Sequence, residues 1–409
     1  MEKYALLYAQ SGGPTTVINA SAYGVIKRAK ELGIKVYVAL NGIEGLLEGR
    51  ISDVSNESEE EIERLRYTPA SAFGSCRLKL PVHTQNDEQY KTILEVFKKL
   101  NIHYFVYNGG NDSMNTCSKI ANFMQENDYE CYVCGIPKTI DNDLLCTDHC
   151  PGYGSAGKFV ATVCNEIALD TDVYAKGRVT IIEIMGRDAG WLTASSALAT
   201  AFGKGPDLIY LPERPFDINE FVKKCEEIYK QKKSCLVAVS EGIRDKDEKY
   251  ICNYAVESKL DMFNNAQLGG VGAYLANLIT EKTNIKTRAI ELSLLQRCAA
   301  HIASLTDNTE AVMAGASAVD AVANKINNKM VAFKRESNAP YKMTTVLAPL
   351  DDIAHGTQSM PDNFIGEDGC SVTQEFIDYA MPLISGEVQL EYKNGLPVFA
   401  SLKNEIVKF

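Results

Sequence analysis

Residues 102–116 read IHYFVYNGGNDSMNT, and this stretch decides how the rest of the chain is interpreted. An apolar, aromatic run ends in two glycines, and a helix-like segment follows. Bare backbone amides at the start of a helix attract anions, and glycine lets a phosphate come close. The stretch therefore predicts a strand, a phosphate-binding turn and a helix. Asn111 and Asp112 follow the glycines, however, and a carboxylate there would oppose a bound phosphate.

The same alternation of apolar runs and helical segments extends in both directions. Strands are predicted at 4–10, 35–40, 103–107, 131–136, 178–185, 207–211, 235–240 and 287–292. An apolar period of 3.6 residues predicts helices at 15–32, 87–100, 113–126, 191–202, 218–231 and 307–326, and one after the glycines near 270. Nearly continuous apolar strands between helices indicate parallel sheets covered on both faces. Residues 41–85 look irregular, and the last ~70 residues look like a strand pair and a tail.

Composition limits the classes of protein to which the chain can belong. Its 409 residues are 45% hydrophobic and 23% charged, which is typical of a globular protein with two or three domains. A net charge of -11 disfavours non-specific nucleic-acid binding, which needs a basic surface. No apolar run approaches the ~20 residues of a membrane span, and the first residues do not resemble a signal peptide. We therefore expect a cytoplasmic protein whose 12 cysteines are reduced.

Glycines, acids and basic residues follow the predicted strands, at the ends where open parallel sheets bind their ligands. These segments are 11–13, 109–113, 137–143, 185–188, 241–242 and 294–297. Such residues are typical of phosphoryl transfer, which depends on charge neutralisation, positioning and one base for the attacking hydroxyl. In PKTIDND at 137–143, one of Asp141 and Asp143 can take a proton while the other holds Mg²⁺. An Asx-rich turn that caps a helix would give the same pattern.

Two further motifs suggest other chemistry. GYGSAGKF at 152–159 nearly matches a Walker A loop, but Phe159 replaces the Ser or Thr that binds Mg²⁺, so a helix start is favoured. Spacing typical of zinc ligands occurs in Cys131, Cys134, Cys146, His149 and Cys150. Cys131 and Cys134 lie in an apolar strand and point to opposite faces, so we favour buried thiols.

Seven motifs together resemble the phosphofructokinase family. In chain order they are SGGP at 11–14, GSCR at 74–77, GGND at 109–112, PKTIDND at 137–143, MGR at 185–187, SEG at 240–242 and TRAIELSLLQR at 287–297. The resemblance covers roughly residues 4–335, and the combination of motifs is highly specific. The lysine before TIDND resembles the pyrophosphate-dependent branch, since ATP-dependent members usually carry glycine there.

The resemblance implies two Rossmann-like three-layer α/β/α domains with mostly parallel sheets and an active site in the cleft between them. The larger domain, for pyrophosphate and Mg²⁺, is expected at 1–150, with about 258–305 returning to it. The smaller domain, for the sugar phosphate, is expected at 151–257, with about 306–335 returning to it. Residues 336–409 would form a C-terminal extension.

The resemblance also implies the reaction. An enzyme of this branch transfers a phosphoryl group from pyrophosphate to the 1-hydroxyl of fructose 6-phosphate, giving fructose 1,6-bisphosphate and phosphate. The transfer is reversible, requires Mg²⁺ and belongs to glycolysis and gluconeogenesis. We expect a homodimer or homotetramer with no nucleic-acid or membrane partner.

Asp112 and Lys138 are the residues that we expect to choose the donor. ATP-using members have glycine at the position of Asp112, which leaves room for the α-phosphate of the nucleotide. In a partly desolvated pocket, a carboxylate there would repel that phosphate by several kcal/mol. Pyrophosphate does not reach that spot, and Lys138 would supply it with a positive charge.

The other donor-side roles are also carried over from the family. Asp141 matches the general base, and Asp143 matches an aspartate near Mg²⁺. Gly12 and Gly110 would line the donor phosphates, and Arg77 would contact them.

On the acceptor side, the sugar would be contacted by Met185, Gly186 and Glu241, and Thr139 would contact the sugar or the donor. Arg187 would stabilise the moving phosphoryl group or the sugar, and Arg297 would clamp the 6-phosphate. Arg178 and Arg288 match arginines that reach the sugar phosphate across a subunit boundary. For each lone arginine, a surface ion pair is the alternative interpretation.

Some positions depart from the family pattern. Asn111 stands where an acid is usual, and an amide carries no charge for Mg²⁺. We therefore expect the metal to rely on Asp141, Asp143 and pyrophosphate itself, and Asn111 stays a candidate ligand beside Asp143. Leu294 replaces a usual His or Tyr, and Cys298 and Ala299 replace two glycines. Three alternatives therefore stay open: an ATP-dependent enzyme in which the acidic side chain swings aside, a non-catalytic regulatory subunit, and an enzyme for another ketose such as sedoheptulose 7-phosphate.

Overall fold

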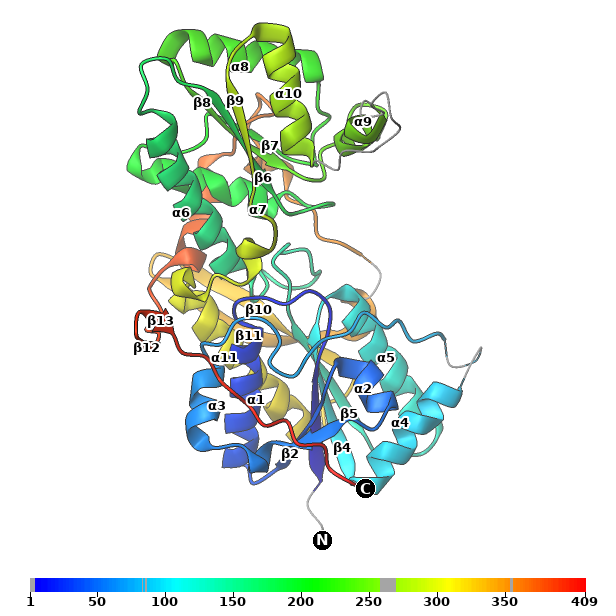
Figure 1. Cartoon of the computed structure of the whole chain (residues 1–409). Coiled ribbons are helices and arrows are strands. Elements are labelled where there is room, and N and C mark those ends of the chain that lie inside the picture. The colour runs from blue at the N-terminus through cyan, green and yellow to red at the C-terminus, as the bar shows by residue number, and fades with distance from the viewer. Residues whose placement is uncertain (1–3, 83, 85–86, 258–269, 354–355) are drawn as a thin grey trace, which may run out of the picture. The chain divides into compact units, whose positions relative to one another are not determined.

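The structure is a computed structural model of the chain, and it describes residues 4–409 except 83, 85–86, 258–269 and 354–355 (Figure 1). The chain forms two compact units. The first comprises Met1–Ser155, Arg297–Thr357 and Ser385–Phe409, and the second comprises Ala156–Gln296 and Gln358–Ile384. Each unit contains its own sheet and its own hydrophobic core.

The first unit is built on a seven-stranded sheet. Its strands are β1 (Ala5–Gln10), β2 (Lys35–Ala39), β3 (Ile51–Asp53), β4 (Ile102–Gly109), β5 (Tyr132–Pro137), β10 (Lys329–Asn338) and β11 (Tyr341–Pro349). Their order across the sheet is β11-β10-β5-β4-β1-β2-β3. The five inner strands run parallel, and the two edge strands pair antiparallel with their neighbours. The expected mostly parallel sheet is confirmed.

Helices cover both faces of this sheet (Figure 1). They are α1 (Ile18–Glu31), α2 (Gly42–Leu47), α3 (Glu59–Leu65), α4 (Glu88–Lys99), α5 (Asn111–Glu126), α11 (Leu305–Ala323) and α12 (Leu350–Ile353). Helices α1 and α11 approach so closely that only glycine fits at their contact. A Cβ on Gly24 would lie 2.2 Å from the carbonyl oxygen of Val312, and one on Gly315 would lie 2.1 Å from that of Ser21. This close contact holds α11 in the first unit.

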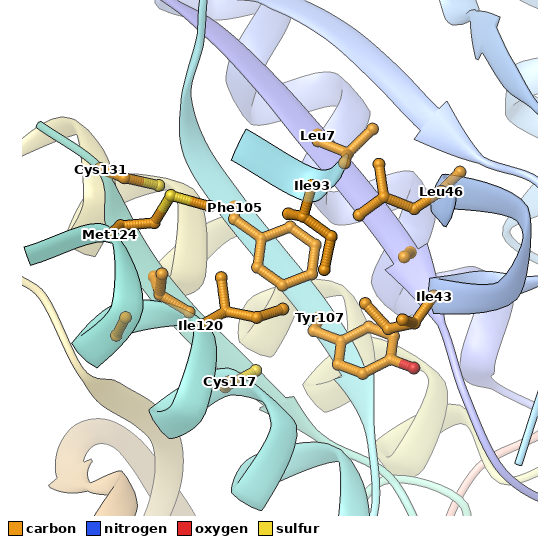
Figure 2. Packing of buried hydrophobic residues seen from close by; sticks show 14 of the residues in the cluster. Leu7, Ile43, Leu46, Ile93, Phe105, Tyr107, Cys117, Ile120, Met124 and Cys131 are labelled. Atoms are coloured by element: carbon orange, nitrogen blue, oxygen red, sulfur yellow. The ribbon is translucent and has the colours of Figure 1, made fainter. Parts of the chain in front are cut away.

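Alternating strand side chains divide the core of the first unit into two layers. Leu7, Phe105 and Tyr107 face one side of the sheet and lie in one cluster with side chains of α2, α4 and α5 (Figure 2). Leu6 and Val106 face the other side, in a cluster that includes side chains of α1 and α11. The two-residue period of a strand produces this division, because successive side chains point to opposite faces.

The second unit has a smaller sheet in which all strands run parallel. Its strands are β6 (Val179–Ile184), β7 (Leu208–Tyr210), β8 (Cys235–Ser240) and β9 (Thr287–Glu291), in the order β7-β8-β6-β9. Its helices include α7 (Trp191–Ala194), α8 (Ile218–Lys232), α9 (Ile251–Glu257), α10 (Val271–Thr283) and α13 (Gln374–Ala380). Helix α6 (Tyr153–Thr171) begins in the first unit and continues into the second.

Several sequence-based expectations differ from the structure. The segment expected to return to the larger domain, about 258–305, lies mostly in the second unit, where β9 pairs with β6. The segment expected to return to the smaller domain, about 306–335, lies in the first unit, where β10 pairs with β5. The expected boundary near 258 lies outside the described residues. The region 41–85 contains α2, β3, α3 and the short 3₁₀ turn Val54–Asn56. The helix expected at 191–202 becomes the 3₁₀ segment Ser195–Phe202 after α7. The other 3₁₀ turns are Ser293–Arg297, Ala300–Ile302, Asp362–Phe364 and Met381–Ile384.

The end of the chain forms an extended segment on the first unit, which we call the C-terminal strap (residues 399–409). The short hairpin of β12 (Tyr392–Lys393) and β13 (Leu396–Pro397) precedes it. The backbone N–H of Val407 donates to the carbonyl of Ile51 at 2.8 Å, beside an antiparallel bridge between Ser52 and Ile406. The strap therefore lies along the outer edge of β3. Within the described residues, no helix has the length and apolarity of a membrane span.

Candidate active site

Three neighbouring strands of the larger sheet end side by side at the segments that the sequence singled out. Gln10 at the end of β1 pairs with Asn108 of β4, and Gly109 pairs with Pro137 at the end of β5. The segments 11–13, 110–112 and 138–143 therefore leave the sheet at one edge, as parallel pairing requires.

The turn after β1 is shaped to receive an anion. Gly12 has a φ of 76°, a conformation that glycine adopts without strain. A Cβ on Gly12 would lie 3.1 Å from Nζ of Lys138, and one on Gly13 would lie 3.0 Å from a guanidinium nitrogen of Arg297 and 3.7 Å from one of Arg77. Three cations thus surround a turn that has no side chain of its own.

Lys138 is the most buried of these cations. Its side chain is 4% exposed, and its ammonium group donates to the carbonyl of Gly13 at 2.6 Å. Burial lowers the pKa of Lys138 to about 8; Asp141 and Asp143 act against this shift, and Arg77 and Arg297 add to it. An anion bound at the turn would favour the charged form of the lysine.

The sequence placed Arg297 on the sugar 6-phosphate; in the structure its guanidinium lies beside Gly13 in the first unit, whereas the MGR and SEG motifs belong to the second. Gly110 is the N-cap of α5, and a Cβ on it would lie 3.7 Å from the carbonyl oxygen of Lys138. Arg297, Gly110 and Lys138 therefore belong to the same small region as the turn at Gly12.

The two residues that open α5 differ in their surroundings. The side-chain oxygen of Asn111 is buried and accepts no hydrogen bond from the described part of the chain. Asp112 is 68% exposed, and its carboxylate forms an ion pair with Lys79 at 2.9 Å. The partly desolvated setting expected for Asp112 is therefore wrong. Water reduces the interaction between two exposed charges 4 Å apart to about 1 kcal/mol.

The TIDND segment forms a tight turn after β5. The backbone N–H of Asp141 donates to the hydroxyl of Thr139 at 3.0 Å. Asn142 has a φ of 56°, and its side-chain oxygen accepts the N–H of Cys150 at 2.9 Å. Asparagine tolerates this left-handed conformation well. The local bond of this turn comes from Thr139, and no helix follows directly, so the Asx-rich helix cap is not found. The two aspartates on either side of Asn142 are half-buried and close enough to Lys138 to influence its charge.

In the second unit, the segments after β6 and β8 lie together. Gly186 has a φ of 130°, and its N–H donates to the carboxylate of Glu241 at 3.4 Å. The hydroxyl of Ser240 donates to the carbonyl of Gly186 at 2.5 Å. Gly242 has no room for a side chain, because a Cβ there would lie 1.9 Å from the carbonyl oxygen of Arg187. These contacts join the MGR and SEG motifs in one small site.

One residue of this second group was not predicted. The side-chain oxygen of Gln296 accepts the N–H of Met185 at 3.2 Å, and Gln296 is buried. Gln296 is part of the SLLQR sequence at 293–297, but the functional interpretation of this sequence was based on the charged Arg297 next to it. Leu294 is 54% exposed.

Arg178 and Arg288 lie away from the MGR and SEG motifs of their own unit. Arg178 precedes β6, whereas Met185 follows it, and seven residues of extended chain span about 23 Å. Arg288 stands opposite Thr180, also near the start of β6. Arg178 forms an ion pair with Asp170. Within one unit these arginines are therefore not brought to Met185.

The two competing motifs have structural roles. The GYGSAGKF segment opens helix α6, as expected, and a carboxylate already occupies that helix start: Asp307 accepts the N–H groups of Gly152 and Ser155 at 2.9 and 2.8 Å. His149 contacts Asp148 and Glu310 through its two ring nitrogens, each at 2.7 Å. The cysteines with zinc-like spacing carry free thiols.

The residues near the Gly12–Gly13 turn and at the start of α5 suit a Mg²⁺ ion that is shared with a phosphate ligand. Mg²⁺ prefers oxygen ligands and usually takes one or two from the protein, with the rest from phosphates and water. Among the described residues, no three His, Cys, Asp or Glu side chains are grouped to hold a metal unaided. The side-chain oxygen of Asn111, which is buried and accepts no hydrogen bond from the described part of the chain, is a suitable oxygen ligand for such a partial set.

Comparison with known proteins agrees with this geometry. The family model described as Phosphofructokinase matches residues 5–322. A protein of Xanthomonas campestris named pyrophosphate–fructose 6-phosphate 1-phosphotransferase is 42% identical, over 98% of this chain and 97% of its own length. A protein of the same name from Halomonas elongata is 41% identical, over 100% and 98%. The crystal structure of a pyrophosphate-dependent phosphofructokinase from Nitrosospira multiformis is 39% identical, covers 100% of this chain and 98% of its own, and superposes with a TM-score of 0.90.

Proposed function

The chain belongs to the phosphofructokinase family, and we propose that it transfers a phosphoryl group reversibly from pyrophosphate to the 1-hydroxyl of fructose 6-phosphate. The products are fructose 1,6-bisphosphate and phosphate. The observation that carries the proposal is the buried ammonium group of Lys138 at the Gly12–Gly13 turn, close to the start of α5 with its Asp112. Lys138 provides a positive charge suited to a phosphate anion, and by its resemblance to the family Asp112 would meet a longer donor.

Donor binding falls to the cations around the turn. Lys138 supplies a point charge, while the planar guanidinium groups of Arg77 and Arg297 suit two phosphate oxygens each. We assign Arg297 to the donor, supported by its 3.0 Å approach to the Cβ position of Gly13. The side-chain-free turn at Gly12 and the amides that open α5 at Gly110 complete the binding of the phosphates.

Asp141 acts as the general base. It takes the proton from the 1-hydroxyl of fructose 6-phosphate as the oxygen attacks the nearer phosphorus atom of pyrophosphate, and the bond to the leaving phosphate breaks in line. The hydroxyl of Thr139, which accepts the N–H of Asp141, fixes the backbone that carries the base. Arg187 stabilises the charge on the phosphoryl group in transfer. When bound between Asn111, Asp143 and the donor, Mg²⁺ would neutralise phosphate charge.

The acceptor is held by the second unit. Met185, Gly186 and Glu241 line the sugar, supported by the contacts that join the MGR and SEG motifs. Arg178 and Arg288 serve the sugar phosphate of a neighbouring subunit, which requires a homodimer or homotetramer. The enzyme acts in the cytoplasm, without nucleic-acid or membrane partners.

Donor choice is the experiment that tests this function. Purified protein is incubated with fructose 6-phosphate, Mg²⁺ and either pyrophosphate or ATP, and fructose 1,6-bisphosphate is measured. We expect product with pyrophosphate alone, and Asp112→Gly should allow measurable use of ATP. Product from the wild-type protein with ATP would contradict the donor assignment. No product with either donor, but product with sedoheptulose 7-phosphate, would change the acceptor; no product with any acceptor would favour a regulatory subunit.

A further inference from the structure

An ion pair connects the start of α5 to the segment that carries Arg77, and it involves Lys79, a residue to which the reaction gives no role. Nζ of Lys79 lies 2.9 Å from a carboxylate oxygen of Asp112, and the two side chains are 73% and 68% exposed. Lys79 comes two residues after Arg77, and Asp112 comes one residue after Asn111. The pair thus links two segments that each present a side chain to the donor.

The segment that carries Lys79 is held at several points along its length; we call residues 74–81 the donor loop. On one side, the hydroxyl of Ser75 donates to the carbonyl of Gly12 at 2.7 Å, and the N–H of Gly12 donates to the carbonyl of Cys76 at 2.9 Å. On the other side, the ammonium group of Lys119 in α5 donates to the carbonyl of Leu80 at 2.8 Å. Arg77 stands between these attachments.

The charge of Asp112 makes its partner important. A pyrophosphate bound at the Gly12 turn carries several negative charges, and an unpaired carboxylate at the start of α5 would oppose it. Lys79 cancels that charge. The same contact gives the donor loop a second attachment to α5, four residues along the loop from Ser75 and next to Leu80.

We propose that Lys79 is a positioning residue for the pyrophosphate donor, acting through its ion pair with Asp112. The pair neutralises Asp112 towards pyrophosphate and fixes the loop that presents Arg77. A donor with a nucleoside attached would have to displace this pair in order to extend past it. The inference rests on the proposed function, since it assigns a further residue to the same donor site.

A double-mutant cycle tests whether Lys79 acts through Asp112. The wild-type protein, Lys79→Gln, Asp112→Asn and the double variant are compared at 0.15 M salt, which limits long-range effects of the lost charge. The KM for pyrophosphate, the KM for fructose 6-phosphate and kcat are measured for each. We expect Lys79→Gln to raise the KM for pyrophosphate about two- to fivefold, as suits an exposed pair, and to leave the other two constants unchanged. In the Asp112→Asn background the same change should have almost no effect, and Lys79→Arg should restore the wild-type KM.

A matched control separates this effect from a general loss of surface charge. Lys325 forms an exposed pair with Glu130 at 3.1 Å, at the opposite end of β5 from Lys138, so Lys325→Gln should leave all three constants unchanged. Equal effects of Lys79→Gln in both backgrounds would overturn the inference, because Lys79 would then act without Asp112. An unchanged KM for pyrophosphate would overturn it as well. A wild-type protein that cannot use pyrophosphate would overturn the proposed function itself, which is a distinguishable result.

Discussion

Lys138 is a cation that the fold keeps almost entirely out of water before any anion is bound. Its burial favours the neutral amine, and the pKa falls to about 8 although Asp141 and Asp143 are near. Bound pyrophosphate would stabilise the charged form and raise the pKa again. The binding of the donor and the protonation of this lysine are therefore linked.

This linkage predicts how donor use depends on pH. Because the unliganded enzyme loses the charge of Lys138 as the pH rises through about 8, kcat/KM for pyrophosphate should fall over that range. In Lys138→Arg the charge persists to much higher pH, so this part of the profile should become flatter, although the absolute rate is lower. The check is kcat/KM for pyrophosphate from pH 6.5 to 9.5 for both proteins. Parallel profiles would assign the decline to another group.

For single residues, the sequence identified those whose residue type and position directly after a strand are typical of binding or catalysis. Lys138, Asp141 and Gly12 stand in motifs directly after strands, and the parallel sheet brings such positions together. Lys79 and Gln296 were missed, because an exposed lysine and a buried glutamine are common and acquire meaning only from the partner they contact. The large exposure of Asp112 was likewise not predictable, because no pattern in the neighbouring sequence indicates it.

Among the elements, strands were easier to predict than short helices. The apolar runs of β1, β4, β5, β6 and β8 are buried on both faces and stand out against their surroundings. Helices α2 and α3 have six and seven residues, too few to show a helical period, so residues 41–85 looked irregular. The helix expected at 191–202 changes to a 3₁₀ segment at Ser195, and half of its residues are Trp, Thr, Ser or Phe, which favour a helix less than Ala or Leu.

One buried network connects elements that are far apart in sequence. His149 lies between Asp148 and Glu310 of α11, and Glu310 also accepts the hydroxyl of Tyr341 in β11 at 2.6 Å. Burial alone would lower the pKa of His149, but the two carboxylates outweigh it and raise the pKa to about 9. The histidine is therefore a buried cation at neutral pH.

Glu310→Gln removes half of this charge compensation. Breaking a buried pair by removing one partner costs about 3–5 kcal/mol, so we expect a loss of that order in the free energy of unfolding near pH 7. The contribution of a raised histidine pKa is complete below its unfolded value of about 6.5 and is lost as the pH rises through about 9, so the difference between the proteins should shrink over that range. Chemical denaturation at several pH values measures it. Glu31→Gln, at a surface pair with Arg28, should change the free energy by less than about 1 kcal/mol at every pH.

For the whole molecule, assigning segments to units was beyond the sequence. Strand β9 joins the smaller sheet and β10 joins the larger one, although neither sequence indicates which strand it pairs with. Alternation predicts the type of sheet, but the partner of a strand is chosen by long-range packing, such as the close contact between α1 and α11. The number of sheets was predictable, and the path of the chain between them was not.

The distance between Arg178 and Met185 along β6 leads to a prediction about the assembly. If Arg178 serves a neighbouring subunit, Arg178→Ala and Asp141→Asn should each be almost inactive, yet a mixture whose subunits have reassorted should regain activity. In a hybrid dimer, one site has both intact residues, so random reassortment should restore about a quarter of the wild-type rate. Activity is measured before and after denaturation and joint refolding of the two variants. A mixture that stays inactive would show that both residues act within one chain.

The C-terminal strap has a consequence for the solubility of the protein. Strand β3 is the last strand at its side of the larger sheet, and the exposed backbone of an edge strand is a template on which another chain can pair and start an aggregate. Here the contacts of Ile406 and Val407 cover that edge with a segment of the same chain. Proteolytic removal of about ten residues would thus expose a strand edge on which other chains can pair, and a tag fused to Phe409 would be attached to the segment that covers this edge.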